Sequence, residues 1–250
     1  MSNLQKDSGV LYVVATPIGN LLDISARALE VLRTVQLIAA EDTRHSRKLL
    51  AHYGIGTPLL ALHEHNEREV TEKLLRRLAA GEDIALVSDA GTPLISDPGF
   101  YLVREARQAR LRVVPVPGAS ALIAALSVAG LPSDRFLFEG FLPSRQTARR
   151  QRLEALAAAT GTLVFYESSH RICDSLRDMA DCFGGMREAT VARELTKTFE
   201  TLLHDTLQGL VEQVEADADQ QKGEFVVLVA GAPARERSAI DAATVQMLAV

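Results

Sequence analysis

Apolar residues recur along the first half of the chain in two alternating patterns. Short runs that are apolar at nearly every position are typical of strands buried on both faces of a parallel sheet. These runs are 11–15, 36–40, 59–62, 84–87 and 113–116. Between them, apolar residues recur every three or four positions, the period of a helix with one buried face. The helical segments are 25–34, 44–52, 66–80, 100–109 and 119–129. The alternation predicts a mainly parallel sheet covered by helices on both faces.

The pattern changes after residue 130, where a short segment containing Gly, Pro, Ser and Asp predicts a linker. Beyond it we expect strands at 136–139, 162–166, 189–193, 199–204 and 225–230, and helices at 145–159, 170–181 and 207–214. Because two of these strands follow each other without a helix, the second sheet is expected to be mixed. The sequence therefore predicts two α/β domains, 10–130 and 135–232, with a cleft between them. The tail, 233–250, is expected to begin a further helical segment.

Composition narrows the function classes only a little. The chain has 250 residues, of which 47% are apolar and 24% charged, as in ordinary globular proteins. Its net charge of −5 argues against a protein coated in basic residues for nucleic-acid binding, but allows a local basic patch. Cys173 and Cys182 have no CxxC or metal-binding spacing. With no apolar run long enough to cross a bilayer, we expect a cytoplasmic protein that binds neither membrane nor metal.

The loops that follow the strands are the expected place for chemistry, because ligands of parallel sheets bind beyond the carboxyl ends of the strands. The longest such loop, 88–99, is rich in Gly, Pro and Asp, which predicts a rigid cradle of backbone groups with Asp89 at the strand tip. This cradle suits a ligand that carries a positive charge. Asp97 is expected only to cap the helix that follows. The chain has no phosphate-binding loop, and its one GxG, at 54–56, precedes a strand.

Eight strings along the chain resemble, in order, one known family. They are VATPIGNLLDIS, AAEDTRHSRKLL, ALHEHNE, ALVSDAGTPLISDPG, VVPVPGASA, LPSDRFLFEGFLP, FYESSHR and VARELTKTFE. Together they resemble the bacterial 16S ribosomal RNA cytidine 2′-O-methyltransferases, which belong to the tetrapyrrole-methylase superfamily. The resemblance implies two α/β domains, a homodimer, S-adenosylmethionine bound in the interdomain cleft, and 16S RNA of the small ribosomal subunit as substrate.

The same resemblance implies, position by position, which residues contact the cofactor. They are Pro17, Asp89, Gly91, Thr92, Ser120, Ala121, Tyr166, Glu167, Leu195 and Gly231. The chain ends at Val250, whereas members of this family usually continue into a further helical segment. If that segment is missing, RNA affinity is the property expected to suffer.

Methylation of a ribose hydroxyl benefits from a general base, or from a cation that stabilises the forming alkoxide. The proposed catalytic residues are Glu41 and Glu139 as bases and Lys197 as the cation, and further candidates are Asp42, His63 and Glu167. Glu41 could instead cap a helix, and Glu139 could pair with an arginine. The sequence does not choose among them.

Basic residues near the predicted strand ends form the candidate RNA contacts. They are Arg44, Arg47, Lys48, Arg145, Arg149, His170 and Arg171. If they line one cleft, they neutralise phosphates and make binding salt-dependent. For Arg150 and Arg152, a solvated helix face is an equal alternative. The sequence His63-Glu64-His65 lacks a third ligand and is not expected to bind metal.

Two other functions stay open. One is methylation of a corrin or porphyrin precursor, although enzymes of that kind commonly carry a GxGPGD-like first loop where this chain has ATPIGN. The other is a non-enzymatic module that binds the cofactor and regulates a partner.

Overall fold

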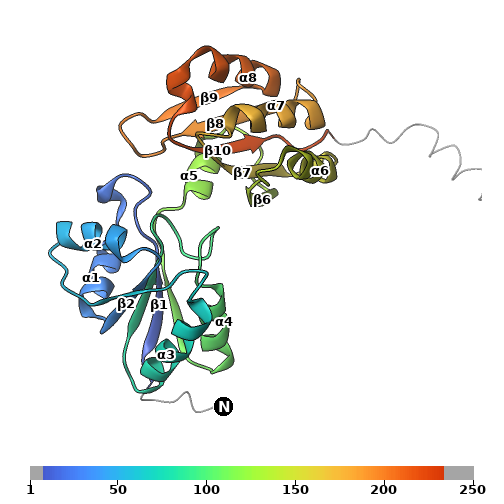
Figure 1. Cartoon of the computed structure of the whole chain (residues 1–250). Coiled ribbons are helices and arrows are strands. Elements are labelled where there is room, and N and C mark those ends of the chain that lie inside the picture. Colours follow the sequence, from blue (N-terminus) through green and yellow to red (C-terminus); the bar gives the residue numbers. More distant parts are fainter. Residues whose placement is uncertain (1–7, 234–250) are drawn as a thin grey trace, which may run out of the picture.

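The computed structural model describes residues 8–233 and shows two lobes, each built on its own five-stranded sheet (Figure 1). The predicted tail, apart from its first residue, lies outside the described residues. The expectation of two α/β domains of the tetrapyrrole-methylase fold, the first parallel and the second mixed, is confirmed.

The first lobe holds a sheet in the order β3-β2-β4-β1-β5, and every pair of neighbouring strands in it is parallel. Its strands are β1 (Val10–Val14), β2 (Leu37–Ala40), β3 (Leu59–Ala61), β4 (Ile84–Val87) and β5 (Arg112–Val116). Its helices are α1 (Ala26–Thr34), α2 (Thr43–His52), α3 (Glu67–Ala79) and α4 (Phe100–Gln108), with a 3-10 turn, η1 (Leu21–Asp23). One face packs on α1 and α2, and the other on α3 and α4. Burial of both faces explains why the strands are apolar throughout.

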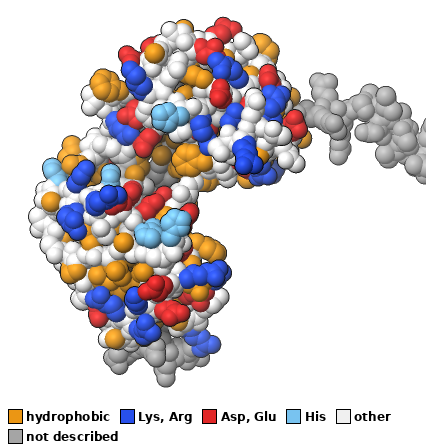
Figure 2. Space-filling view, in the orientation of Figure 1, with side chains coloured by type: hydrophobic (Ala, Val, Ile, Leu, Met, Phe, Trp, Pro, Cys, Tyr) orange, Lys and Arg blue, Asp and Glu red, His pale blue; other side chains and the backbone are white. Residues whose placement is uncertain are grey.

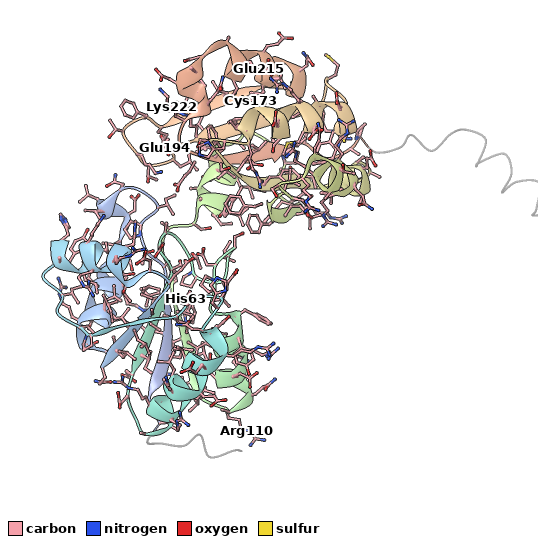
Figure 3. The ribbon with its side chains drawn as sticks, in the orientation of Figure 1. His63, Arg110, Cys173, Glu194, Glu215 and Lys222 are labelled. Carbon is pink, nitrogen blue, oxygen red and sulfur yellow. The ribbon has the colours of Figure 1, made fainter. Side chains whose placement is uncertain are left out.

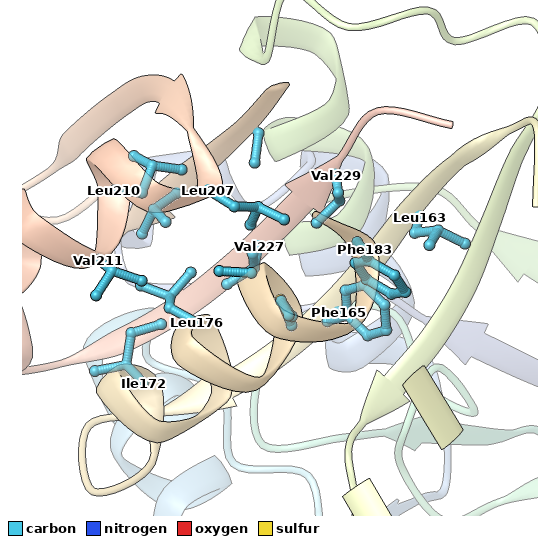
Figure 4. Close-up of a cluster of buried hydrophobic side chains, with 14 of the residues drawn as sticks. Leu163, Phe165, Ile172, Leu176, Phe183, Leu207, Leu210, Val211, Val227 and Val229 are labelled. Carbon is cyan, nitrogen blue, oxygen red and sulfur yellow. The ribbon is translucent and has the colours of Figure 1, made fainter. Parts of the chain in front are cut away.

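The second lobe holds a mixed sheet in the order β6-β7-β10-β8-β9, in which only β6 and β7 are parallel. Its strands are β6 (Phe136–Phe141), β7 (Thr162–Ser168), β8 (Glu188–Arg193), β9 (Thr201–Thr206) and β10 (Glu224–Val229). Its helices are α6 (Gln146–Leu156), α7 (Ile172–Phe183) and α8 (Leu207–Ala216), with η2 (Ala218–Gln221). These helices cover one face of the sheet, and the core between them includes Phe165, Leu176 and Val227 (Figure 4).

The helix α5 (Ala121–Val128) lies between the lobes rather than within the first one. Leu122 and Ala125 on this helix pack with Val226 and Leu228 of β10. The sequence of α5, ALIAALSV, is apolar on almost every side, so the helix can cover the face of the second sheet that α6–α8 leave open. This contact brings the strand ends of the first sheet beneath the second lobe.

Candidate active site

A cavity of about 460 Å³ lies between the two lobes. The lower wall is formed by residues that follow strands of the first sheet, namely Glu41, 89–92, 95–97 and 120–121. The upper wall is formed by residues of the second lobe, namely 166–169, Ala192, Leu195, Lys197 and 223–226. In the space-filling view a hollow separates the lobes, with acidic and histidine side chains on its lower edge (Figure 2). The cavity therefore lies beyond the carboxyl ends of the parallel strands, as ligand sites of such sheets do.

The long loop after β4 is held in place by the loop after β1. The amide of Thr16 donates to the carbonyl of Gly91 at 2.8 Å, and the amide of Gly91 donates back at 3.1 Å. Gly91 has a φ of +80°, which glycine adopts without strain, whereas Leu94 and Ser96 adopt left-handed values of 74° and 66°. Strained backbone of this kind persists where the surrounding structure fixes it and is common at functional sites.

Three carboxylates lie on the lower wall of the cavity: Glu41, Asp89 and Asp97. Asp89 Oδ1 accepts a hydrogen bond from the amide of Asp42 at 3.0 Å. Burial raises the pKa of Glu41, and the neighbouring charge of Asp89 raises it further. Glu41 forms no ion pair within the described part of the chain. It is therefore a carboxylate whose basicity is raised and whose oxygens are not committed to a cation.

Asp97 is a site residue that the sequence did not identify. Burial raises its pKa to about 6, a hydrogen bond to Ser88 opposes the shift, and the charges of Glu41 and Asp89 add to it. The expected helix cap is instead Glu67, whose Oε1 accepts from the amides of Gly99 and Tyr101 at 3.1 and 2.9 Å. The sequence expectation failed because Glu67 is remote from α4 along the chain.

Tyr166 lies on the upper wall, near the carboxyl end of β7. Its hydroxyl accepts a hydrogen bond from the amide of Leu122 at 3.1 Å, so it ties the second sheet to the first turn of α5. Burial raises the pKa of the Tyr166 phenol. Edge-on contacts with the rings of Phe138 and Phe141, at 4.9 and 5.7 Å between centroids, fix the orientation of the tyrosine ring.

Lys197 also lies on the upper wall, in the loop between β8 and β9. Its Nζ donates to Glu194 at 2.8 Å and to Glu224 at 2.7 Å. Burial lowers the pKa of Lys197, but the two carboxylates outweigh it and the net shift is upward. Glu194 lies in the upper lobe, above the loops of the lower one (Figure 3). A Cβ at Gly19 would collide with the stem of Lys197, so the first loop and this lysine are in contact.

Comparison with known proteins agrees with this geometry. The family model described as Tetrapyrrole (Corrin/Porphyrin) Methylases matches residues 10–211. A Xylella fastidiosa (strain Temecula1) protein named ribosomal RNA small subunit methyltransferase I is 63% identical over 232 residues, which cover 93% of this chain and 85% of the relative. The protein of that name from Pseudomonas aeruginosa is 63% identical over 233 residues, covering 92% and 83%. The chain belongs to this family of tetrapyrrole methylases.

Solved structures with the same fold are far less similar in sequence. Uroporphyrin-III-C-methyltransferase from Thermus thermophilus aligns with a TM-score of 0.62 at 18% identity, covering 89% of this chain and 94% of the other. Diphthine synthase aligns with a TM-score of 0.66 at 16% identity, covering 89% and 90%. These likenesses establish the fold that the family shares.

Most of the residues that the family resemblance assigns to the cofactor line the cavity. They are Asp89, Gly91, Thr92, Ser120, Ala121, Tyr166, Glu167 and Leu195. The carboxylate of Glu167 is fully buried and bound by Arg171 and Ser175, so only its backbone can reach a ligand. Pro17 lines a second, smaller cavity instead.

The structure does not place Gly231 where the expected cofactor contact requires it. It follows the carboxyl end of β10, whereas the cavity is lined by the first residues of that strand, 224–226. A Cβ at Gly231 would collide with the carbonyl of Thr160. The glycine therefore permits two backbone segments to approach each other and does not form part of the cavity wall.

The expected role of Glu139 as a catalytic base is also corrected, because its carboxylate is not on the cavity wall. The side chain is 7% exposed, and Arg152 donates to both of its oxygens, at 2.8 and 2.9 Å. The alternative left open by the sequence, pairing with an arginine, is the one the structure adopts. With both oxygens held by Arg152, the Glu139 carboxylate is not free to contact a substrate in the cavity.

Two of the basic residues expected to contact RNA are bound to partners within the second lobe. Arg149 is 3% exposed, and its Nε donates to Asp178 at 2.7 Å. Arg171 donates to Glu167 at 2.8 Å and to the carbonyl of Leu142 at 2.8 Å. Both arginines therefore hold the second lobe together, and their guanidinium groups are not free for phosphates.

The other candidate RNA residues are exposed, namely Arg44, Arg47, Lys48, Arg145 and His170. Arg44 is paired with Asp42 at 2.7 Å. His63 and His65 have ring centroids 5.9 Å apart, and His63 lies in the lower lobe (Figure 3). Among residues 8–233, no group of His, Cys, Asp and Glu could hold a metal ion, and no helix is long and apolar enough to cross a membrane.

Proposed function

We propose that this protein transfers the methyl group of S-adenosylmethionine to the ribose 2′-hydroxyl of a cytidine in 16S RNA of the small ribosomal subunit. The observation that supports it is the interlobe cavity with the carboxylate of Glu41, which no cation pairs within residues 8–233, in a chain 63% identical to proteins named ribosomal RNA small subunit methyltransferase I. The solved structures of enzymes named for tetrapyrrole substrates share the fold at below 20% identity, so they give much weaker support to the alternative substrate.

The residues of the cavity fit this methyl donor. Its volume of about 460 Å³ falls within the range of small-molecule sites. The apolar residues Leu195 and Val226 on the upper wall suit an adenine ring, and the carboxylates opposite suit the positive sulfonium and amino groups. When bound, the donor supplies a methyl group activated by a positively charged sulfur.

Glu41 is the residue that we assign as general base. Its carboxylate would take the proton of the ribose 2′-hydroxyl as that oxygen accepts the methyl group that a donor bound in the cavity would supply. The raised pKa of Glu41 makes it a stronger base than an exposed carboxylate at neutral pH. Asp89, held by the amide of Asp42, stays next to the reacting groups as a fixed negative charge.

Lys197 acts in this scheme as a positioning residue. Because Glu194 and Glu224 neutralise its ammonium group, it stabilises a forming alkoxide poorly. It instead fixes the β8–β9 loop against the start of β10, and thereby fixes part of the cavity wall.

Incubation with methyl-labelled donor and small ribosomal subunits that lack the modification tests the proposal. We expect label in the RNA, at a position where the neighbouring phosphodiester bond resists alkali because the 2′-oxygen is blocked. Label on a base, or none in RNA, would reject it. Absorbance-detected binding of a precursor macrocycle would support the tetrapyrrole alternative.

We further propose that the protein acts as a homodimer in the cytoplasm. The family resemblance supports the dimer, and the exposed apolar side chains Ile123, Val128 and Phe136, which are 54%, 51% and 42% exposed, offer surface for it. Sedimentation of the purified protein distinguishes monomer from dimer.

A further inference from the structure

A second cavity of about 270 Å³ lies beside the first one. The loop after β1 separates them, since Ile18 lines the first cavity whereas Pro17 and Gly19 line the second. Asp89 lines both. Groups bound in the two cavities would therefore both lie next to the carboxylate of Asp89.

The walls of this cavity are mostly apolar. Pro17 belongs to the loop after β1, Leu21 to η1 and Leu49 to α2, and all three line the cavity. Ser46, which also lines the cavity, is 4% exposed, and its hydroxyl forms no hydrogen bond within residues 8–233.

The mouth of the cavity is cationic. His45 and Lys48, one helical turn apart on α2, line it and are exposed, and the exposed Arg47 lies between them in sequence. Neither Lys48 nor Arg47 forms an ion pair within residues 8–233. The nearby carboxylate of Asp42 is already bound by Arg44, whose hydrogen bonds hold the pKa of Asp42 well below its usual range.

We propose that the second cavity holds the pyrimidine base of the acceptor nucleotide, turned out of its RNA strand. This inference rests on the proposed RNA methylation. The volume is slightly below that of typical drug-sized sites and suits one planar ring packed on the apolar side chains of Pro17, Leu21 and Leu49. Lys48, which lines the cavity and is exposed, is available for a phosphate next to the base. Enzymes that modify nucleotides read an extruded base in this way.

Filling the cavity is the direct test. We expect Leu49→Trp to raise KM for undermethylated small subunits at least tenfold, while the calorimetric Kd for S-adenosylhomocysteine stays within twofold of wild type. The matched control is Ala51→Met, which adds bulk to the exposed side of the same helix and is expected to change neither value. An unchanged KM in Leu49→Trp, or an equal loss of S-adenosylhomocysteine affinity, would overturn the inference.

A surface substitution that cannot disturb folding provides the second arm. Lys48→Gln is expected to reduce the slope of log affinity for RNA against log salt by about one unit, as the loss of one phosphate contact does. Arg110→Gln removes a charge at the far end of the lower lobe (Figure 3) and is expected to leave the slope unchanged. An unchanged slope in Lys48→Gln contradicts the inference. If wild-type protein labels no RNA, the proposed function itself has failed.

Discussion

The sequence and the structure assign different roles to Arg149. The sequence assigns it to RNA, whereas the structure places it in an ion pair between α6 and α7, with Asp178 only 2% exposed. Removing one partner of a buried pair leaves the other charged and desolvated, which typically costs about 3–5 kcal/mol. Asp178 keeps two further hydrogen bonds, from Arg150 at 3.0 Å and Gln146 at 3.3 Å. The cost of Arg149→Met is therefore expected at the lower end, about 3 kcal/mol.

The expected result is a loss of stability without a loss of RNA affinity per folded molecule. For a protein of this size, about 3 kcal/mol lowers the melting temperature by roughly 6–12 °C. Arg145→Met, one turn earlier and exposed, is the stability control and is expected to change the melting temperature by less than about 2 °C. Calorimetric melting and RNA binding at a temperature where both variants are folded measure the two quantities. Weaker RNA binding by Arg149→Met with an unchanged melting temperature would refute the structural assignment.

Three further outcomes test the site. Glu41→Gln should lower kcat by about 10²–10⁴-fold in a methyl-transfer assay while leaving the calorimetric affinity for S-adenosylhomocysteine nearly unchanged; an active variant would exclude Glu41 as the base. Glu139→Gln, remote from the cavity wall, should retain kcat. A fall in kcat comparable to that of Glu41→Gln would instead make Glu139 a catalytic candidate again. Asp97 has a folded pKa of about 6, above its ordinary 3.8. Between these two pH values Asp97 is therefore more often protonated in the folded state than in the unfolded state. The stability that Asp97 contributes is therefore present below about pH 4 and lost as pH rises through about 6. Urea unfolding at several pH values should show Asp97→Asn gaining stability relative to wild type over that interval, and a constant difference would contradict the assignment.

The sequence predicted the two sheets well because their signals are local. The run 84–87 is apolar at every position and is short, which is typical of a strand buried on both faces. The same logic located the cavity, because the carboxyl ends of parallel strands meet at one edge of a sheet. This rule alone predicted that Asp89 lies on the cavity wall.

The failures concern pairings between distant segments. Arg149 meets Asp178 on another helix, and Glu67 caps α4 from the start of α3. A sequence without a structure shows a basic or acidic residue but not the partner that occupies it. The raised pKa of Asp97 likewise comes from burial, which its neighbours in the chain do not reveal.

These pairings also change what can be expected of RNA binding. Arg149 and Arg171 are occupied inside the second lobe. The candidate cations that are exposed and have no ion pair within residues 8–233 are Arg47, Lys48 and Arg145. Three phosphate contacts imply a slope of log affinity against log salt of only about −2 to −3, and hence weak attraction to RNA in general. A chain with a net charge of −5 then has to select its substrate by shape and by the extruded base. We therefore expect the protein to prefer assembled small subunits to naked RNA, and a slope of −6 or steeper would show that a larger basic surface is in contact.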